Sequence, residues 1–582
     1  MKRYGKYVKP YLSAFIIGPC LMLVEVVGEI LMPKLMSMII NNGIADRDTG
    51  YIIRIGLYML AAAMIMAIGG VGGAYFSSKA SICFTSDLRR DLFAKVQQFS
   101  FKNIDAYSTG SLVTRLTNDV QQVQQLMVMC LRMALRAPGM MIGALIMAFT
   151  INSRLAMIIL IVIPLLTIVI AIILTTAYPR FGVMQKKLDT LNSGIQEALI
   201  NVRVVKSFVR EDFEKDKFGR ANQDLQSSSL AAMNIVIVSM PVMMLAMNIT
   251  TLAVVWYGGN MIIAGDMPVG DLTAFTTYIV QILMSLMFLS MIFLQSSRAM
   301  ASIKRINEVL NTEVDLTDGD AAHKDLPVTK GRVEFKDVSF SYHPKSQESG
   351  SEVLQHISFT AEPGQVIGII GATGSGKTSL VQLIPRLYDV TGGQVLVDGV
   401  DVKDYSLHHL REGVGMVLQK NVLFSGTIEE NLRWGSEDAS PEDVRAFAKA
   451  AQADAFINTF TNGYETDMGQ GGVNVSGGQK QRLCIARALL KKPKILILDD
   501  STSAVDTATE AKIRECFRTT LKDATKIIIA QRIGSVEEAD QILVLDNGRM
   551  ISQGTHDELI KTCEAYQEIY YSQRDKEEEV SA

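Results

Sequence analysis

The sequence has few cysteines, and none of them are closely spaced. Its six cysteines are scattered over 582 residues, and no two form a CxxC motif. Closely spaced cysteines are typical of zinc sites and of disulfide-stapled secreted domains. The sequence therefore favours neither class, and we expect the cysteines to be ordinary free thiols.

A strong charge of one sign and an N-terminal cleavage site are also lacking. Lys and Arg number 57 against 60 Asp and Glu, a net charge of −3 that gives no indication of a nucleic-acid partner. The opening "MKRYGKYVKPYLSAFIIGPCLML" resembles a signal peptide, but its apolar run continues to Met32 without an AxA site. We therefore interpret it as a retained membrane helix.

Long apolar runs, by contrast, are abundant. Hydrophobic residues make up 48% of the chain and are concentrated in its first half. Six segments approach the ~20 residues that cross ~30 Å of hydrocarbon. A very hydrophobic buried bundle is the alternative, and six such segments in one chain argue against it. The predicted spans lie near residues 12–33, 52–75, 130–150, 155–177, 235–262 and 272–295.

The loops between these spans alternate in length and in charge. The long loops 76–129 and 178–234 carry most of the Lys and Arg, whereas 34–51, 151–154 and 263–271 are short and carry few. The positive-inside rule then places the long loops and both termini in the cytoplasm. Stretches such as "SDLRRDLFAKVQQFSF" show helical patterning, so we expect the long loops to extend the spanning helices into the cytoplasm.

Composition divides the chain into successive regions. Residues 1–310 form the predicted transmembrane domain, and the polar stretch 311–330 reads as a linker. From Gly331 to about residue 570, short Val/Ile/Leu runs alternate with helical stretches, which is typical of an α/β domain with a mixed sheet. The charged tail 571–582 is expected to be disordered.

The stretch "VIGIIGATGSGKTSL" (366–380) reads as a strand, a GxxxxGK(S/T) loop and a helix. Glycines let backbone N–H groups close around phosphates, and the helix N-terminus favours anions. Lys377 would reach the β- and γ-phosphates, and the Thr378 hydroxyl would bind Mg²⁺. A chance glycine loop is the alternative, and the flanking strand and helix argue against it. The predicted ATP-binding residues here are Gly371, Ala372, Thr373, Gly374, Ser375, Gly376, Lys377, Thr378 and Ser379.

Two further motifs follow in order along the chain. "NVSGGQKQR" (474–482) resembles the LSGGQ signature of ATP-binding-cassette (ABC) proteins, and "ILILDD" (495–500) reads as a buried parallel strand ending in two aspartates. The resemblance covers nearly the whole chain and implies a half-transporter similar to type IV ABC exporters. The implied fold is an all-α six-helix transmembrane domain with long cytoplasmic helical extensions, followed by an α/β P-loop nucleotide-binding domain.

The resemblance also implies roles for individual residues. Two cassettes pair head to tail, so that the signature of one chain completes the ATP site of the other. Segments 104–120 and 202–214 resemble the first and second coupling helices. The implied roles are adenine stacking for Tyr342, Mg²⁺ binding for Thr378, Gln419 and Asp499, contact with the partner's ATP for Ser476, Gly477, Gly478 and Gln479, and the D-loop "SAVD" (503–506) for Asp506.

Three positions depart from the family pattern. Asp500 stands where the catalytic Glu is expected, Gln531 where the switch His is expected, and Gln470 where exporters carry an acid. A carboxylate one carbon short is displaced by about 1.5 Å, and misplacement on this scale can cost about 10²-fold in rate. Gln531 cannot carry a proton or a positive charge. Neutral drift is the alternative, but two losses in one site argue against it.

The chain therefore resembles the degenerate-site subunit of a heterodimeric bacterial ABC exporter in the cell membrane. We expect a partner half-transporter that carries the catalytic Glu and His, with ATP and Mg²⁺ as ligands. The expected cargo is an amphipathic drug or lipid moved outward by alternating access. A homodimeric lipid flippase and a regulatory ABC protein that gates without transport are the alternatives, and the impaired site and the coupling helices respectively argue against them.

Two acids lie in the first predicted span. Glu25 and Glu29 are four residues apart and thus on one helical face. Intramembrane acids are costly and commonly functional, so both are candidates for attracting cationic substrates or for pairing at an outer gate. The alternative for Glu29, four residues before Pro33, is that it merely reaches the membrane interface.

Overall fold

The computed structural model of the chain describes residues 4–318, 322–342, 352–501 and 505–581. It divides into two compact units. One comprises Met1–Gln97 and Thr109–Thr312, and the other comprises Gln98–Ser108 and Glu313–Ala582. The short segment Gln98–Ser108 therefore belongs with the C-terminal unit although it is flanked in sequence by the N-terminal one.

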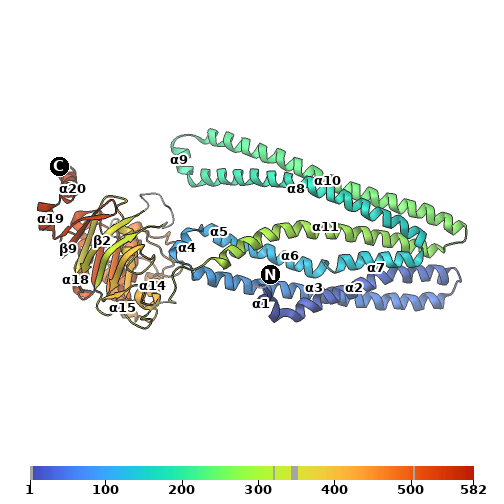
Figure 1. Cartoon of the computed structure of the whole chain (residues 1–582), viewed down its shortest axis with the longest axis horizontal. Coiled ribbons are helices and arrows are strands. Elements are labelled where there is room, and N and C mark those ends of the chain that lie inside the picture. Colours follow the sequence, from blue (N-terminus) through green and yellow to red (C-terminus); the bar gives the residue numbers. More distant parts are fainter. Residues whose placement is uncertain (1–3, 319–321, 343–351, 502–504, 582) are drawn as a thin grey trace. The chain divides into compact units, whose positions relative to one another are not determined.

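The first unit is all-helical. Six helical stretches of the described residues are long and apolar enough to cross a membrane, which confirms the predicted six spans. Several helices continue far beyond their apolar parts, and α8 and α10 lie side by side, joined through α9 (Figure 1). The α-helices are α1 (Gly5–Val8), α2 (Leu12–Met38), α3 (Thr49–Gln97), α5 (Thr109–Thr114), α6 (Val120–Met133), α7 (Arg136–Ile151), α8 (Ser153–Ile200), α9 (Val202–Ser207), α10 (Glu211–Ile263) and α11 (Val269–Asn311).

Glycines let α2 and α3 pack with their backbones close together. A Cβ atom at Gly69 would lie 2.9 Å from the Leu21 carbonyl oxygen, and one at Gly73 would lie 3.1 Å from the Gly18 oxygen. Small residues at such positions are typical of membrane helix pairs, which lack a hydrophobic driving force between them. This close pair brings Glu25 of α2 against Gly69 and Gly70 of α3.

The two segments that resemble coupling helices differ in extent from the sequence expectation. A five-residue helix, α4 (Phe101–Asp105), begins at a capping box formed by Ser100 and Asn103. The expected segment 104–120 contains only the end of α4 and continues through α5 into a π-helical turn at Arg115–Asp119. Segment 202–214 likewise holds α9 and the start of α10. Each segment identified by sequence similarity therefore contains a short helix or part of one (α4 or α9) together with the beginning of the helical stretch that follows it (α5 or α10).

The second unit is an α/β domain with two sheets. Strand order is β2-β1-β4-β5 in the antiparallel sheet and β10-β9-β3-β8-β7-β6 in the mainly parallel one. The strands are β1 (Val333–Phe340), β2 (Leu354–Ala361), β3 (Val366–Gly371), β4 (Gly392–Val397), β5 (Val400–Asp401), β6 (Val414–Val417), β7 (Ile495–Asp499), β8 (Thr525–Ile529), β9 (Gln541–Asp546) and β10 (Arg549–Gly554). The helices are α12 (Lys377–Gln382), α13 (Leu407–Glu412), α14 (Ile428–Arg433), α15 (Pro441–Ala450), α16 (Asp454–Ile457), α17 (Gly477–Leu490), α18 (Thr507–Thr520), α19 (His556–Thr562) and α20 (Glu564–Ser581).

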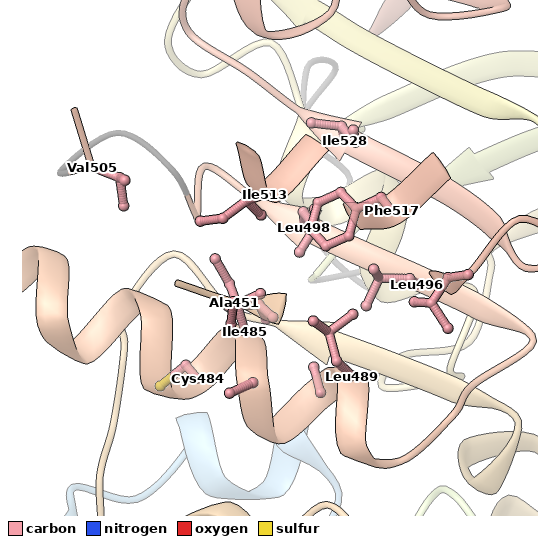
Figure 2. Packing of buried hydrophobic residues seen from close by; sticks show 14 of the residues in the cluster. Ala451, Cys484, Ile485, Leu489, Leu496, Leu498, Val505, Ile513, Phe517 and Ile528 are labelled. Carbon is pink, nitrogen blue, oxygen red and sulfur yellow. The ribbon is translucent and has the colours of Figure 1, made fainter. Parts of the chain in front are cut away.

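Strand β7 is buried along its whole length, as its run of aliphatic residues predicts. It pairs in parallel with β6 and β8. Its Leu496 and Leu498 lie among the side chains of α17 and α18 (Figure 2). Fully burying such side chains stabilises the fold by roughly 1.5–3 kcal/mol each. The strand that ends in Asp499 is therefore firmly held by its core.

The C-terminal tail differs from the prediction of disorder. Helix α20 begins at Glu564 and ends at Ser581, so the segment 571–581 is helical. Its Gln, Lys and Glu residues are strong helix formers, and composition alone does not separate a solvated helix from a disordered charged tail. The expectation of disorder was therefore wrong.

Candidate functional site

The predicted nucleotide site lies where three parallel strands end. Residue pairs Ile369–Ile529 and Asp499–Ile529 align β3, β8 and β7 at the same level. The P-loop, the two aspartates and Gln531 follow these strand ends directly. A cavity of about 780 Å³ is lined by all nine predicted ATP-binding residues of 371–379 together with Gln419, Asp499, Asp500 and Gln531. The structure thus brings together residues that are up to 160 positions apart, from 371 to 531.

The P-loop requires glycine at defined positions. A Cβ atom at Gly371 would lie 2.1 Å from the Leu545 carbonyl oxygen, and Gly376 has a φ of +92°. Both features exclude ordinary side chains, so the backbone can close tightly around an anion. Lys377 Nζ donates to the carbonyl oxygens of Gly371 and Ala372, each at 2.8 Å. Burial lowers the pKa of Lys377, which leaves its ammonium in need of an anionic partner.

Asp499 and Thr378 form an oxygen-rich corner of the cavity. The Thr378 hydroxyl donates to Asp499 Oδ1 at 3.0 Å. Asp499 Oδ2 is buried and has no hydrogen-bond partner among the described residues. Burial raises the pKa of the Asp499 carboxyl, and the Thr378 hydrogen bond and the Lys377 charge oppose this shift only in part. Two oxygens with one orphaned carboxylate atom fit the hard, oxygen-liganded cation Mg²⁺.

The two departures from the family pattern meet in one contact. Gln531 Nε2 donates to Asp500 Oδ2 at 2.7 Å. Burial raises the pKa of Asp500, and a side-chain hydrogen bond with Gln419 opposes this shift. Asp500 also adopts a left-handed backbone conformation, with a φ of +47°. Asp500 is therefore held by two glutamine amides at the edge of the nucleotide cavity.

Tyr342 lies in an aromatic cluster beside the P-loop helix. Its hydroxyl is 2.9 Å from Ser379 Oγ, and its ring packs edge-on against Tyr388 at 5.1 Å between centroids. The Tyr388 hydroxyl in turn donates to Asp105 Oδ2 of α4 at 2.7 Å, and its ring lies 6.1 Å from that of Phe101. Burial and Asp105 both raise the pKa of Tyr388. Tyr388 therefore links Tyr342, the predicted adenine-stacking residue, to the short helix α4.

The signature residues lie apart from this cavity. Ser476 caps α17: its hydroxyl accepts from the Gln479 backbone N–H, and Gln479 Oε1 accepts from the Ser476 N–H. Gly477 and Gly478 begin the helix. Residues 476–479 are not among the described residues that line the cavity. This arrangement suits an exposed anion-binding helix start that serves another chain.

The D-loop residue Asp506 caps α18. Its Oδ1 accepts from the Thr509 backbone N–H at 2.9 Å, and this hydrogen bond lowers its pKa. Of the "SAVD" motif (503–506), residues 503 and 504 lie outside the described part of the chain.

In the membrane unit, Glu25 and Glu29 share a partner that the sequence analysis did not name. Arg136 Nη2 at the start of α7 lies 3.3 Å from Glu25 Oε1 and 3.0 Å from Glu29 Oε2. Gln281 of α11 donates to the Glu29 carbonyl oxygen at 3.1 Å. We define Glu25, Glu29 and Arg136 as the membrane triad. It leaves one formal negative charge in an apolar segment.

Sequence reasoning also missed the contribution of α20. Its Ala565, Glu568, Ile569 and Ser572 line the nucleotide cavity. A charged residue inside the apolar segment 130–150 could have pointed to Arg136, because intramembrane charges commonly pair. The charged composition of 571–582 gave no comparable signal for α20.

Comparisons with known proteins agree with this architecture. Residues 15–286 match the family described as ABC transporter transmembrane region, and residues 354–503 match the family described as ABC transporter. The chain is 40% identical over 577 residues to YfiB of Bacillus subtilis, an uncharacterized ABC transporter ATP-binding protein. The aligned region covers 99% of this chain and 99% of that protein. It is 34% identical over 484 residues to a fatty acid ABC transporter ATP-binding/permease protein of Mycobacterium bovis, covering 83% of this chain and 75% of that protein.

A solved structure shares the whole fold. The structure of a bacterial Atm1-family ABC exporter with ATP bound superposes with a TM-score of 0.80 at 26% identity, covering 97% of this chain and 98% of that one. The expected exporter fold is thus confirmed, although Gln470 departs from the exporter pattern. Six apolar helices followed by an ATPase cassette make the chain a multi-pass membrane protein. The chain therefore belongs to the ABC transporter family, as an ATP-driven exporter half-transporter of the kind that works as a dimer.

Proposed function

We propose that this chain is the hydrolysis-impaired subunit of a heterodimeric exporter. The contact between Gln531 Nε2 and Asp500 Oδ2 carries the proposal. In a working site, the second acid accepts a proton from water and the switch residue contacts the γ-phosphate. Here the acid is Asp500, whose side chain is one carbon shorter than that of Glu. One of its carboxylate oxygens accepts a hydrogen bond from the Gln531 amide, which cannot transfer a proton. Both departures thus weaken the same catalytic step.

The consequence is an asymmetric pair of ATP sites. Each 1.4 kcal/mol of lost transition-state stabilisation slows a reaction about tenfold. An aspartate in place of the catalytic glutamate and a missing histidine can therefore together lower the rate of ATP hydrolysis by several powers of ten. ATP bound at Lys377 and Thr378 would remain across many cycles and keep the two cassettes in contact. Turnover would occur at the other site, where the α17 N-terminus with Ser476 and Gly477 faces the partner's ATP.

Mg²⁺ belongs to this proposal as the metal that accompanies ATP. The orphaned Asp499 Oδ2, the Thr378 hydroxyl and the Gln419 side chain would hold it. When bound, it would neutralise phosphate charge. Asp499 Oδ1 accepts a hydrogen bond from the Thr378 hydroxyl, and Oδ2 has no hydrogen-bond partner among the described residues, so it is free to take a ligand role.

Amphipathic molecules are the proposed cargo. The relative from Mycobacterium bovis is named as a fatty acid transporter, which supports a lipid-like or drug-like class. The membrane triad adds a preference within that class, because its net negative charge favours cationic groups. We place the long helical extensions of α3, α8 and α10 in the cytoplasm of a bacterial cell, following their Lys and Arg content.

A heterodimer should be directly visible by mass. The tagged chain, isolated in mild detergent from its native host, is expected to co-purify with a second half-transporter that carries Glu and His at the positions of Asp500 and Gln531. Native mass spectrometry measures the composition. A stable homodimer with full ATPase activity would contradict the proposal.

Two single changes should separate the two ATP sites. Asp500→Ala should leave most of the steady-state ATPase activity, because this site contributes little to turnover. Gly477→Asp should nearly abolish it, because a carboxylate at the start of α17 repels the partner's γ-phosphate. The measurement is phosphate release by the purified complex. Equal loss in both variants would mean that Asp500 is a working base.

Removal of the Asp499 charge should uncouple ATP binding from Mg²⁺. Asp499→Asn keeps an oxygen that can accept from Thr378 but loses the negative charge. Perturbing a metal's ligand surroundings commonly costs 10–100-fold in affinity, so we expect Mg²⁺-dependent ATP binding at this site to weaken by about tenfold or more. Equilibrium ATP binding is measured with and without Mg²⁺, and Asp523→Asn on the surface is the control. An unchanged Mg²⁺ dependence would exclude Asp499 as a ligand.

The membrane triad should influence substrate charge preference. In Glu25→Gln/Glu29→Gln, transport of cationic dyes into inside-out vesicles should fall several-fold more than transport of neutral dyes, because the attractive charge is gone. Glu197→Gln, an exposed acid on α8, is the matched control. Equal loss for both dye classes would assign the triad to helix packing or gating instead.

A further inference from the structure

The C-terminal helix α20 is anchored to the cassette at its beginning. Tyr566 is completely buried, and its hydroxyl lies 2.8 Å from His556 Nδ1 of α19. Cys563, directly before the helix, is 7% exposed. Both side chains belong to the same core cluster as Val544 of β9. The first turns of α20 are therefore fixed in place.

The next turns of α20 reach the nucleotide cavity. Ala565, Glu568, Ile569 and Ser572 line it, and their spacing of three and four residues puts them on one face of the helix. The same cavity is lined by Lys377, Asp500 and Gln531. One wall of the nucleotide site is thus supplied by the end of the chain.

Gln573, the residue that follows this face, holds the segment after β8. Its Oε1 accepts from the Ile533 backbone N–H at 2.9 Å, and its Nε2 donates to the Gln531 carbonyl oxygen at 2.8 Å. One side-chain amide therefore spans Arg532 and satisfies a backbone donor and a backbone acceptor. These backbone groups lie beyond the end of β8 at Ile529 and need partners from outside the strand ladder.

Gln531 connects this segment to the acid at the end of β7. Its backbone carbonyl oxygen is held by Gln573, and its side-chain Nε2 donates to Asp500 Oδ2 at 2.7 Å. Hydrogen bonds therefore run from Gln573 to Gln531 and from Gln531 to Asp500, and the helix that carries Gln573 is anchored by the buried Tyr566. The orientation of the Gln531 amide depends on where α20 holds its backbone.

We propose that Gln573 is a positioning residue of this nucleotide site, through which α20 fixes the 531–533 segment and keeps Gln531 against Asp500. The proposal rests on the ATP-retaining role proposed above for this site. The contact between the Gln531 side chain and Asp500, held in place by this segment, keeps the cavity wall closed around bound ATP. Loosening it opens the wall and speeds the release of nucleotide.

The test measures release of radiolabelled ATP from the purified full-length complex. The phase that belongs to this chain is the one lost in Lys377→Ala. Gln573→Ala removes two neutral hydrogen bonds and should accelerate that phase by about tenfold or more. Gln573→Glu keeps an acceptor for the Ile533 N–H but loses the donor to the Gln531 carbonyl, so it should also accelerate release. The matched control is Gln567→Ala, because Gln567 lies on the same helix but donates to the Ile560 carbonyl oxygen.

A double-mutant cycle distinguishes positioning from general destabilisation. If Gln573 acts through Gln531, Gln573→Ala should add nothing in a Gln531→Ala background, although the two single changes each speed release. Additive effects, an unchanged release rate in Gln573→Ala, or an equal effect of Gln567→Ala would overturn the proposal. Phosphate release reports the hydrolytic asymmetry, whereas ATP release reports the link between Gln573 and Gln531. A failure of the proposed function and a failure of this inference therefore give different results.

Discussion

The parallel register of β3, β8 and β7 is the constraint on which the nucleotide site depends. It sets the ends of the three strands at one level, so that the P-loop, Asp499 and the segment containing Gln531 surround one cavity. A slip of one residue would turn alternate side chains to the opposite face of the sheet. The side chains of β7 are buried and closely packed, so such a slip would also exchange Ile and Leu between the two faces and disturb the core packing.

A second constraint acts in the membrane unit, where an uncompensated charged side chain is energetically unfavourable. Arg136 compensates two acids that lie one turn apart on α2, and the close approach of α2 and α3 at Gly69 places Glu25 against the neighbouring helix. This partial compensation is what the proposed preference for cationic cargo rests on. Packing and electrostatics thus act at the same place in the helix pair.

Motifs with a fixed local geometry could be predicted from sequence, and contacts set by tertiary packing could not. The P-loop, the buried β7 and the six spans follow from glycine spacing, aliphatic runs and segment length. Arg136 was missed because its partners lie more than 100 residues away. Gln573 was missed because a charged segment has the same composition whether it is disordered or packed as a helix. The limits of α4 depended on a capping box whose N3 residue is Asn103.

The backbone conformation at position 500 favours aspartate over glutamate for a reason that is separate from catalysis. Its φ of +47° lies in the left-handed region, where Asp is enriched several-fold among non-glycine residues because its short side chain bonds locally. A glutamate here would carry more conformational strain, of the kind that active sites commonly maintain at the expense of stability. A hydrolysis-impaired site of the kind proposed here does not have to sustain that strain. Under the proposed function, Asp500 would thus give up catalytic reach for a more relaxed backbone, a trade of activity for stability within a single residue.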